Sequence, residues 1–192
     1  IYASEGVYAV SWAGHTGRDV LQAGDAPPQM SALGPSGFVT HSEYAEKRFY
    51  LAALNNGPAD NFLGPVIRPS GLSVPLPAPF ADAQSGASPH LALNLRGVSL
   101  VPHQVEISWN GTVIGSATLA DRGEATFESV LPDLLPTNTL TLTGKAGDVD
   151  YTAIETARVY YHRAYTALDN QLRFTAEGGD SITLDGFTEP GI

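Results

Sequence analysis

His103-Gln-Val-Glu-Ile-Ser-Trp-Asn-Gly-Thr-Val-Ile-Gly115 is the stretch of this 192-residue chain that decides its fold. Apolar residues at 105, 107 and 109 alternate with polar ones, a period of two that is typical of a strand with one buried face. Asn110-Gly111 then supplies two residues that tolerate a positive φ, as a tight hairpin turn requires. The next residues return as the partner strand, so the stretch predicts a β-hairpin over residues 103–120.

The rest of residues 91–192 continues this pattern of short strands between turns. Patterns of helical period are almost absent, and we expect strands at 91–95, 123–130, 139–143, 152–167, 172–174 and 181–184. About eight short strands in about 100 residues are typical of a sandwich. The sequence therefore predicts an all-β protein whose C-terminal half is an antiparallel β-sandwich of the jelly-roll or Greek-key type.

Residues 1–90 are less regular, although they contain strand patterns. Gly6–Trp12 predicts one strand, and Gly37–His41 predicts another. Residues 65–89 form a proline-rich connector, which we expect to be extended and to run across a surface. We therefore predict an irregular, strand-containing N-terminal region at 1–90 and a β-sandwich domain at 91–192.

The composition excludes several classes of function. The net charge of −10 repels nucleic acid and anionic membranes, and no basic stripe offsets it. No apolar run is long enough for a transmembrane segment. Zero cysteines exclude disulfides, thiolate metal sites and a cysteine nucleophile within this chain. Charged residues make up only 16%, against about 25% in an average domain, which is common in secreted β proteins.

Several short motifs resemble a known family. They include the 103–115 hairpin, Asn138-Thr-Leu-Thr-Leu142, Tyr160-Tyr-His-Arg-Ala-Tyr165 and Ile182-Thr-Leu-Asp-Gly-Phe187. The pattern resembles the β-sandwich region upstream of the catalytic domain in gingipain-type cysteine peptidases and related bacterial exported proteins. Asn61-Phe-Leu-Gly64 departs from it, because those relatives usually have a tryptophan-rich segment there. The resemblance implies a non-catalytic accessory module, part of a longer protein that is secreted, periplasmic or on the cell surface.

Residues of catalytic type are present but do not form a motif. No two of the five histidines lie within a local metal-ligand spacing, and the Gly-x-Ser-x-Gly elbow is absent. His103 is expected to be a surface or strand-edge imidazole. Asp148 and Asp150 are about 7 Å apart if they lie on one strand, a separation that inverting glycosidases use. Both fall in a predicted solvated turn, where neither acquires the pKa of a general acid, so we predict that the chain is not an enzyme.

Calcium is the one cofactor that the sequence suggests. Asp148 and Asp150 lie in a turn before a long strand, and sandwich modules often hold a structural Ca²⁺ with loop carboxylates. The competing interpretation is conformational, because aspartate and glycine are common in turns without any metal.

Aromatic residues suggest a ligand surface. Tyr160, Tyr161 and Tyr165 share one predicted strand, and Trp109 lies on a neighbour, so an exposed row could stack on sugar rings. The competing interpretation is a core role, because Trp109 is in phase with Val105 and Ile107 and tyrosines often bury their rings.

Taken together, the sequence predicts a non-catalytic structural or interaction module that packs against a protein partner or a neighbouring domain of the same polypeptide. Its neutral, charge-poor surface favours this function. The alternative is a carbohydrate-binding module that uses exposed aromatics on a sheet face. A hydrolase is the third hypothesis, and it requires converging carboxylates or a Ser–His pair in a cleft.

Overall fold

The computed structural model describes residues 5–11, 36–54, 61–83, 85–177 and 182–188, which contain thirteen strands and no helix. The predicted all-β fold is confirmed. None of these residues forms a helix long and apolar enough to cross a membrane. Packing divides the chain into two compact units, a larger one (41–81 and 87–161) and a smaller one (1–40, 82–86 and 162–192).

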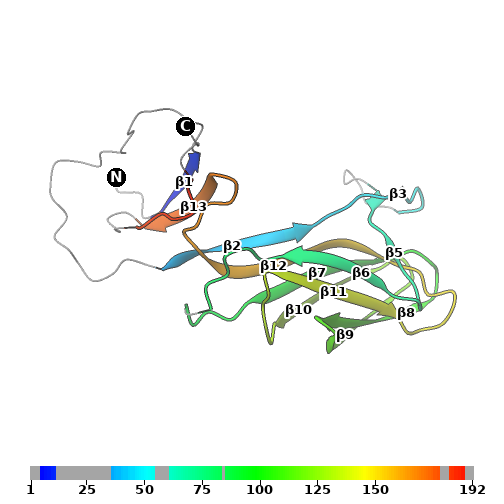
Figure 1. Cartoon of the computed structure of the whole chain (residues 1–192). Helices are drawn as coiled ribbons and strands as arrows, with labels where there is room; N and C mark the ends of the chain where they lie inside the picture. The colour runs from blue at the N-terminus through cyan, green and yellow to red at the C-terminus, as the bar shows by residue number, and fades with distance from the viewer. Residues whose placement is uncertain (1–4, 12–35, 55–60, 84, 178–181, 189–192) are drawn as a thin grey trace. The chain divides into compact units, whose positions relative to one another are not determined.

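Two sheets build the larger unit (Figure 1). The first has the order β10-β7-β12-β2, with β5 also paired to β12, and the second has the order β6-β11-β8-β9. Their bounds are β2 Gly37–Tyr44, β5 Val66–Ile67, β6 Leu72–Pro77, β7 His90–Gly97, β8 Pro102–Trp109, β9 Thr112–Ala120, β10 Glu124–Val130, β11 Thr137–Gly144 and β12 Thr152–Ala164. A short pair, β3 (Phe49–Tyr50) and β4 (Phe62–Leu63), accompanies them.

The core of the larger unit follows from the alternation in the sequence. Each strand turns every second side chain inward, so leucines of β7 meet apolar residues of β8 and β11. The innermost members are Leu91, Leu93, Leu95, Val105, Ile107, Trp109, Leu140 and Leu142. This core closes the two sheets into the predicted sandwich.

The predicted hairpin is β8–β9. Asn110 and Gly111 both have positive φ, at 49° and 86°, as the two-residue turn requires. The Asn110 amide oxygen also accepts a hydrogen bond from the backbone N–H of Thr139, at 2.9 Å, on the neighbouring strand. The asparagine therefore links the turn to β11.

The compact units do not follow a division at residue 90. The proline-rich connector contributes β6, which pairs with β11 and buries Val74 and Leu76 in the core. Pro75 and Pro77 lie on this outer strand of the sheet, where a missing N–H costs no ladder bond. The connector is therefore partly a sheet edge.

The smaller unit contains the antiparallel pair β1 (Glu5–Ser11) and β13 (Gln171–Glu177). Its apolar cluster includes Phe38, Tyr165 and Phe174, whose rings are 5.2–6.2 Å apart between centroids. The strand predicted at 181–184 is wrong for residues 182–184, which are irregular. Ile182 and Leu184 pack against this cluster instead. Their alternation therefore reflects side-chain packing by a segment that pairs with no strand at these residues.

Candidate functional site

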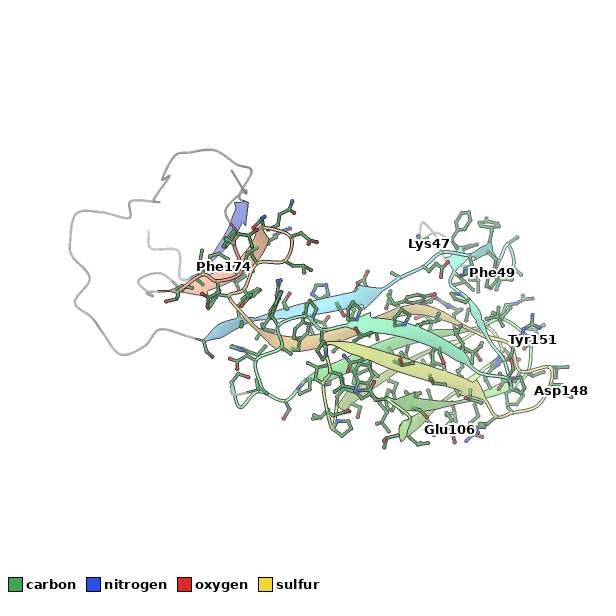
Figure 2. All side chains as sticks on the ribbon, viewed as in Figure 1. Lys47, Phe49, Glu106, Asp148, Tyr151 and Phe174 are labelled. Carbon is green, nitrogen blue, oxygen red and sulfur yellow. The ribbon has the colours of Figure 1, made fainter. Side chains whose placement is uncertain are left out.

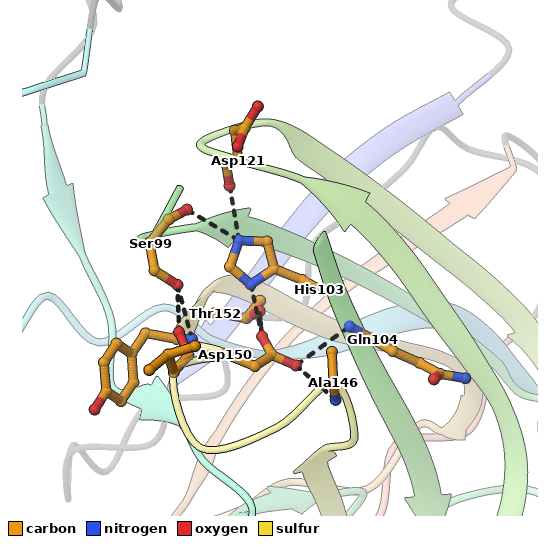
Figure 3. A network of polar contacts seen from close by, with 9 residues as sticks. Ser99, His103, Gln104, Asp121, Ala146, Asp150 and Thr152 are labelled. Atoms are coloured by element: carbon orange, nitrogen blue, oxygen red, sulfur yellow. Dashed lines mark hydrogen bonds and ion pairs between the residues drawn. The ribbon is translucent and has the colours of Figure 1, made fainter. Parts of the chain in front are cut away.

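A buried histidine–aspartate pair lies beneath one end of the larger unit (Figure 3). Nδ1 of His103 is 2.6 Å from Oδ1 of Asp150, and both side chains are fully buried. Nε2 of His103 lies 2.8 Å from the carbonyl oxygen of Asp121 and 3.1 Å from that of Ser99. Carbonyls and carboxylates accept hydrogen bonds, so with Asp150 ionised the ring donates from both nitrogens, which is the charged form of histidine.

Asp150 is saturated by donors from its own chain. Oδ1 also accepts from the Thr152 hydroxyl at 3.2 Å, and Oδ2 accepts from the backbone N–H groups of Gln104 at 3.3 Å and Ala146 at 3.2 Å. A buried charge is tolerated when it is paired and hydrogen-bonded in this way. The position of Asp150 is consequently fixed by β8, by β12 of the other sheet and by the loop after β11.

This network joins three loops, which follow β7, β9 and β11. The Ser99 hydroxyl donates to the carbonyl of Val149 at 2.7 Å and accepts from the N–H of Tyr151 at 3.1 Å. Gly97 lets the loops approach, because a Cβ there would overlap the Asp121 carbonyl oxygen. We call this end of the larger unit, formed by residues 45–54, 61–71, 98–101, 121–123 and 145–151, the loop end.

Apolar side chains project from these fixed loops. Leu100 is 64% exposed, Val149 60% and Tyr151 37%. The guanidinium of Arg68 lies over the Tyr151 ring, 5.6 Å from its centroid. We call Arg68, Leu100, Val149 and Tyr151 the loop-end patch.

A second aromatic group lies at the same end. Tyr50 and Phe62, from β3 and β4, are both exposed, with ring centroids 5.3 Å apart and planes at 61°. Leu54 and Leu63 pack with Ala153 and Val98, which connects this segment to the sandwich. Figure 2 shows Phe49, Tyr151 and Asp148 toward this end.

Glu46 is the centre of an exposed polar cluster beside these strands. The Tyr44 hydroxyl and Nε of Arg48 both donate to its carboxylate, at 2.6 Å each. These two hydrogen bonds hold the pKa of the Glu46 carboxyl below its usual value. Partial burial, assisted by Glu46, raises the pKa of Tyr44 to about 12.

The four predicted ligand aromatics do not form an exposed row. Trp109 is 0% exposed and donates from Nε1 to the Asp133 carbonyl at 2.9 Å, and Tyr161 is 6% exposed, so both belong to the core of the larger unit. Tyr165 is 4% exposed, in the core of the smaller unit. Tyr160 is half-buried beside His41, with ring centroids 5.4 Å apart. Trp109, Tyr161 and Tyr165 therefore have the core role of the competing interpretation.

The two predicted metal ligands lie in different environments. Asp148 is exposed in its turn, but Asp150 is buried, so the expectation that both are solvated is wrong for Asp150. Donors from the chain already occupy both oxygens of Asp150. The described residues contain no group of three or more His, Asp or Glu arranged to hold a metal ion. The turn therefore does not fit a calcium site centred on Asp148 and Asp150.

The His103–Asp150 pair is unsuited to acid–base catalysis. A catalytic histidine directs its free nitrogen at a nucleophile or a substrate. Nε2 of His103 faces two carbonyl oxygens instead, and the ring is sealed from solvent. The expectation of a surface or strand-edge imidazole is therefore also wrong. The alternation of the sequence indicates the burial of His103, because this residue precedes Val105, Ile107 and Trp109 on the inward face of β8.

The sequence matches no family model and no curated protein. Among solved structures, the CBM36-1 domain of a multidomain xylanase from the hindgut metagenome of Trinervitermes trinervoides is 14% identical, over 63% of this chain and 95% of that domain, with a TM-score of 0.41. A CBM36 carbohydrate-binding module in complex with calcium and xylotriose is 13% identical, over 63% of this chain and 98% of that module, with a TM-score of 0.40.

Dimeric latent PorU from Porphyromonas gingivalis is 9% identical and has a TM-score of 0.49. The similarity covers 82% of this chain but only 14% of PorU. All three likenesses are distant, so the function has to be argued from the residues of this chain.

Proposed function

We propose that this chain is a non-catalytic β-sandwich module of a larger exported or cell-surface bacterial protein, and that its loop end binds a protein partner. The observation that carries the proposal is the loop-end patch. Its apolar side chains are exposed on loops that a buried ionic network holds in place. A surface fixed before binding loses little conformational freedom when a partner arrives.

The composition of the patch is that of a protein interface. Tyrosine and arginine are among the residues that most often dominate binding energy at such interfaces, and the Arg68 guanidinium lies over the Tyr151 ring here. Leu100 and Val149 add branched apolar surface beside them. This combination fits a partner segment with apolar side chains.

A sugar-binding surface fits the same end less well. Flat stacking on a sugar requires an open ring face, and Arg68 lies over the Tyr151 ring. Tyr50 and Phe62 meet at 61°, so they do not form one platform. The glycan alternative is retained as an outcome of the experiment.

The proposal is tested by panning a phage-displayed random-peptide library against the intact chain. Peptides that bind the loop end are expected to lose affinity for a Leu100→Ser, Val149→Ser variant. A Val113→Ser, Val130→Ser variant is the matched control, because it removes two exposed valines at the opposite end of the strands. Thermal melts establish that both variants fold.

Peptides that respond equally to both variants would contradict the proposal. An empty selection combined with retention of the chain on a polysaccharide, lost in Tyr151→Ala, would support the glycan alternative.

A further inference from the structure

We infer that Arg68 is a carboxylate-binding anchor at the loop end, so that the partner presents an aspartate or glutamate among apolar side chains. The inference rests on the proposed function and names the chemistry of the partner. The Arg68 guanidinium lies over the Tyr151 ring, 5.6 Å from its centroid.

The contact with Tyr151 is one between a cation and a ring face, and it uses none of the hydrogen-bond donors of Arg68. A guanidinium carries five N–H groups in its plane. Those groups match the two oxygens of a carboxylate in a bidentate pair. The residue is exposed, so its edge is accessible from solvent.

The backbone holds Arg68 in position. Its carbonyl oxygen accepts hydrogen bonds from Gly71, at 2.9 Å, and Gly144, at 3.1 Å. Gly71 has a φ of +83°, which closes the turn between β5 and β6. The guanidinium therefore starts from a fixed turn and rests on a fixed ring, which lowers the entropy lost on binding.

Other cations at the loop end are engaged differently. Arg48 pairs with Glu46 at 2.6 Å and Lys145 with Glu106 at 2.9 Å. Arg122 donates to the carbonyl oxygens of Val98 and Ala53. Within the described part of the chain, the Arg68 side chain forms no such ion pair and contacts the Tyr151 ring. Unlike Arg48, Arg122 and Lys145, it donates to neither an acid nor a carbonyl of these residues.

Charge distribution agrees with an acidic partner. The chain has ten Lys and Arg residues against twenty Asp and Glu, so an acidic segment is repelled by most of its surface. The loop end holds half of the cations (Lys47, Arg48, Arg68, Arg122 and Lys145) but only four of the twenty acids (Glu46, Asp121, Asp148 and Asp150). This end is therefore where an acidic segment meets the least repulsion.

The selected peptides provide the test. They are expected to share one aspartate or glutamate, and Arg68→Gln is expected to weaken their binding roughly ten- to hundred-fold, as the loss of a charged hydrogen-bonded pair does. Arg68→Lys keeps the charge without the fork and should fall between wild type and Arg68→Gln. Lys145→Gln is the matched control, since it removes the same charge at the same end.

A coupling measurement makes the test specific. Changing the shared acid to its amide should weaken binding to the wild-type chain and change little further in Arg68→Gln. Peptides that need Leu100 and Val149 but carry no shared acid, or that respond alike to Arg68→Gln and Lys145→Gln, would overturn the anchor and leave the proposed function standing. Peptides indifferent to Leu100 and Val149, or no selected peptides at all, count against both.

Discussion

At the loop end of the larger unit, a charged pair lies beneath the turns, whereas at the opposite end a neutral amide has the corresponding position. Asn138 is fully buried there, donates to the carbonyls of Leu76 and Leu135 at 3.2 and 2.7 Å, and accepts from the N–H of Leu135 at 2.8 Å. One network links distant loops through an ion pair, and the other links its own turn to β6 and to the β8–β9 hairpin through neutral hydrogen bonds.

This difference has a consequence for recognition. An ion pair needs both partners in place, so the three loops at the loop end are held together as one body. The amide at the hairpin end joins its own turn to Leu76 of β6 and to Asn110 of the hairpin, without any charge. Loops that are held together can present a continuous surface, and this is the physical reason for proposing a partner site at the loop end.

The sharpest way to break the comparison is Asp150→Ala. The variant leaves a buried imidazolium at His103 without its counter-charge, and we expect the free energy of unfolding to fall by about 3–5 kcal/mol. Urea unfolding monitored by circular dichroism measures the change. A loss below about 1 kcal/mol would contradict a buried charged pair.

Two further measurements separate charge from packing. Nitrogen-edited NMR spectra should show protons on both ring nitrogens of His103, because both face acceptors. The double variant His103→Leu, Asp150→Leu should lose less stability than Asp150→Ala, since no unpaired charge remains.

The matching change at the hairpin end is Asn138→Ala. It leaves the N–H of Leu135 and two carbonyls without their partner, and we expect a loss of about 1–3 kcal/mol. The loss should be smaller than for Asp150→Ala, because no charge is stranded. Equal losses in the two variants, measured by the same unfolding experiment, would remove the distinction between the ends.

The sequence predicted the structure of the hairpin end better than that of the loop end. The hairpin end is local, because Asn110-Gly111 and the alternating residues before it determine the turn and the buried face within ten residues. The loop end depends on His103 meeting Asp150 across 47 positions, and alternation does not reveal which strands become neighbours. The phase of His103 predicts a buried side chain, but its partner emerges only from the pairing of β8 with β11.

The predicted ligand residues illustrate the same limit. Tyr160 and Tyr161 lie on β12 and Tyr165 directly after its end, and only the packing decides which rings face inward. The exposed Tyr151 and Leu100 lie in loops without periodicity, so no sequence pattern marked them. Strand patterns predicted the core, while the surface presented for binding depends on loop conformation.

The smallest expected effect concerns Tyr44, whose hydrogen bond to Glu46 lies near the surface at the loop end. Its pKa is raised to about 12, chiefly by burial and then by Glu46, so the neutral phenol is favoured in the folded state. Its contribution to stability is complete below the ordinary tyrosine pKa of about 10 and is lost as the pH rises through about 12. The phenolate absorbance that Tyr44→Phe removes should therefore develop late in an alkaline titration, and Glu46→Gln should move it to lower pH. A Tyr44 signal that titrates at the ordinary value would show that this exposed hydrogen bond does not persist in solution. The buried His103–Asp150 pair, which is sealed from solvent, is expected to persist.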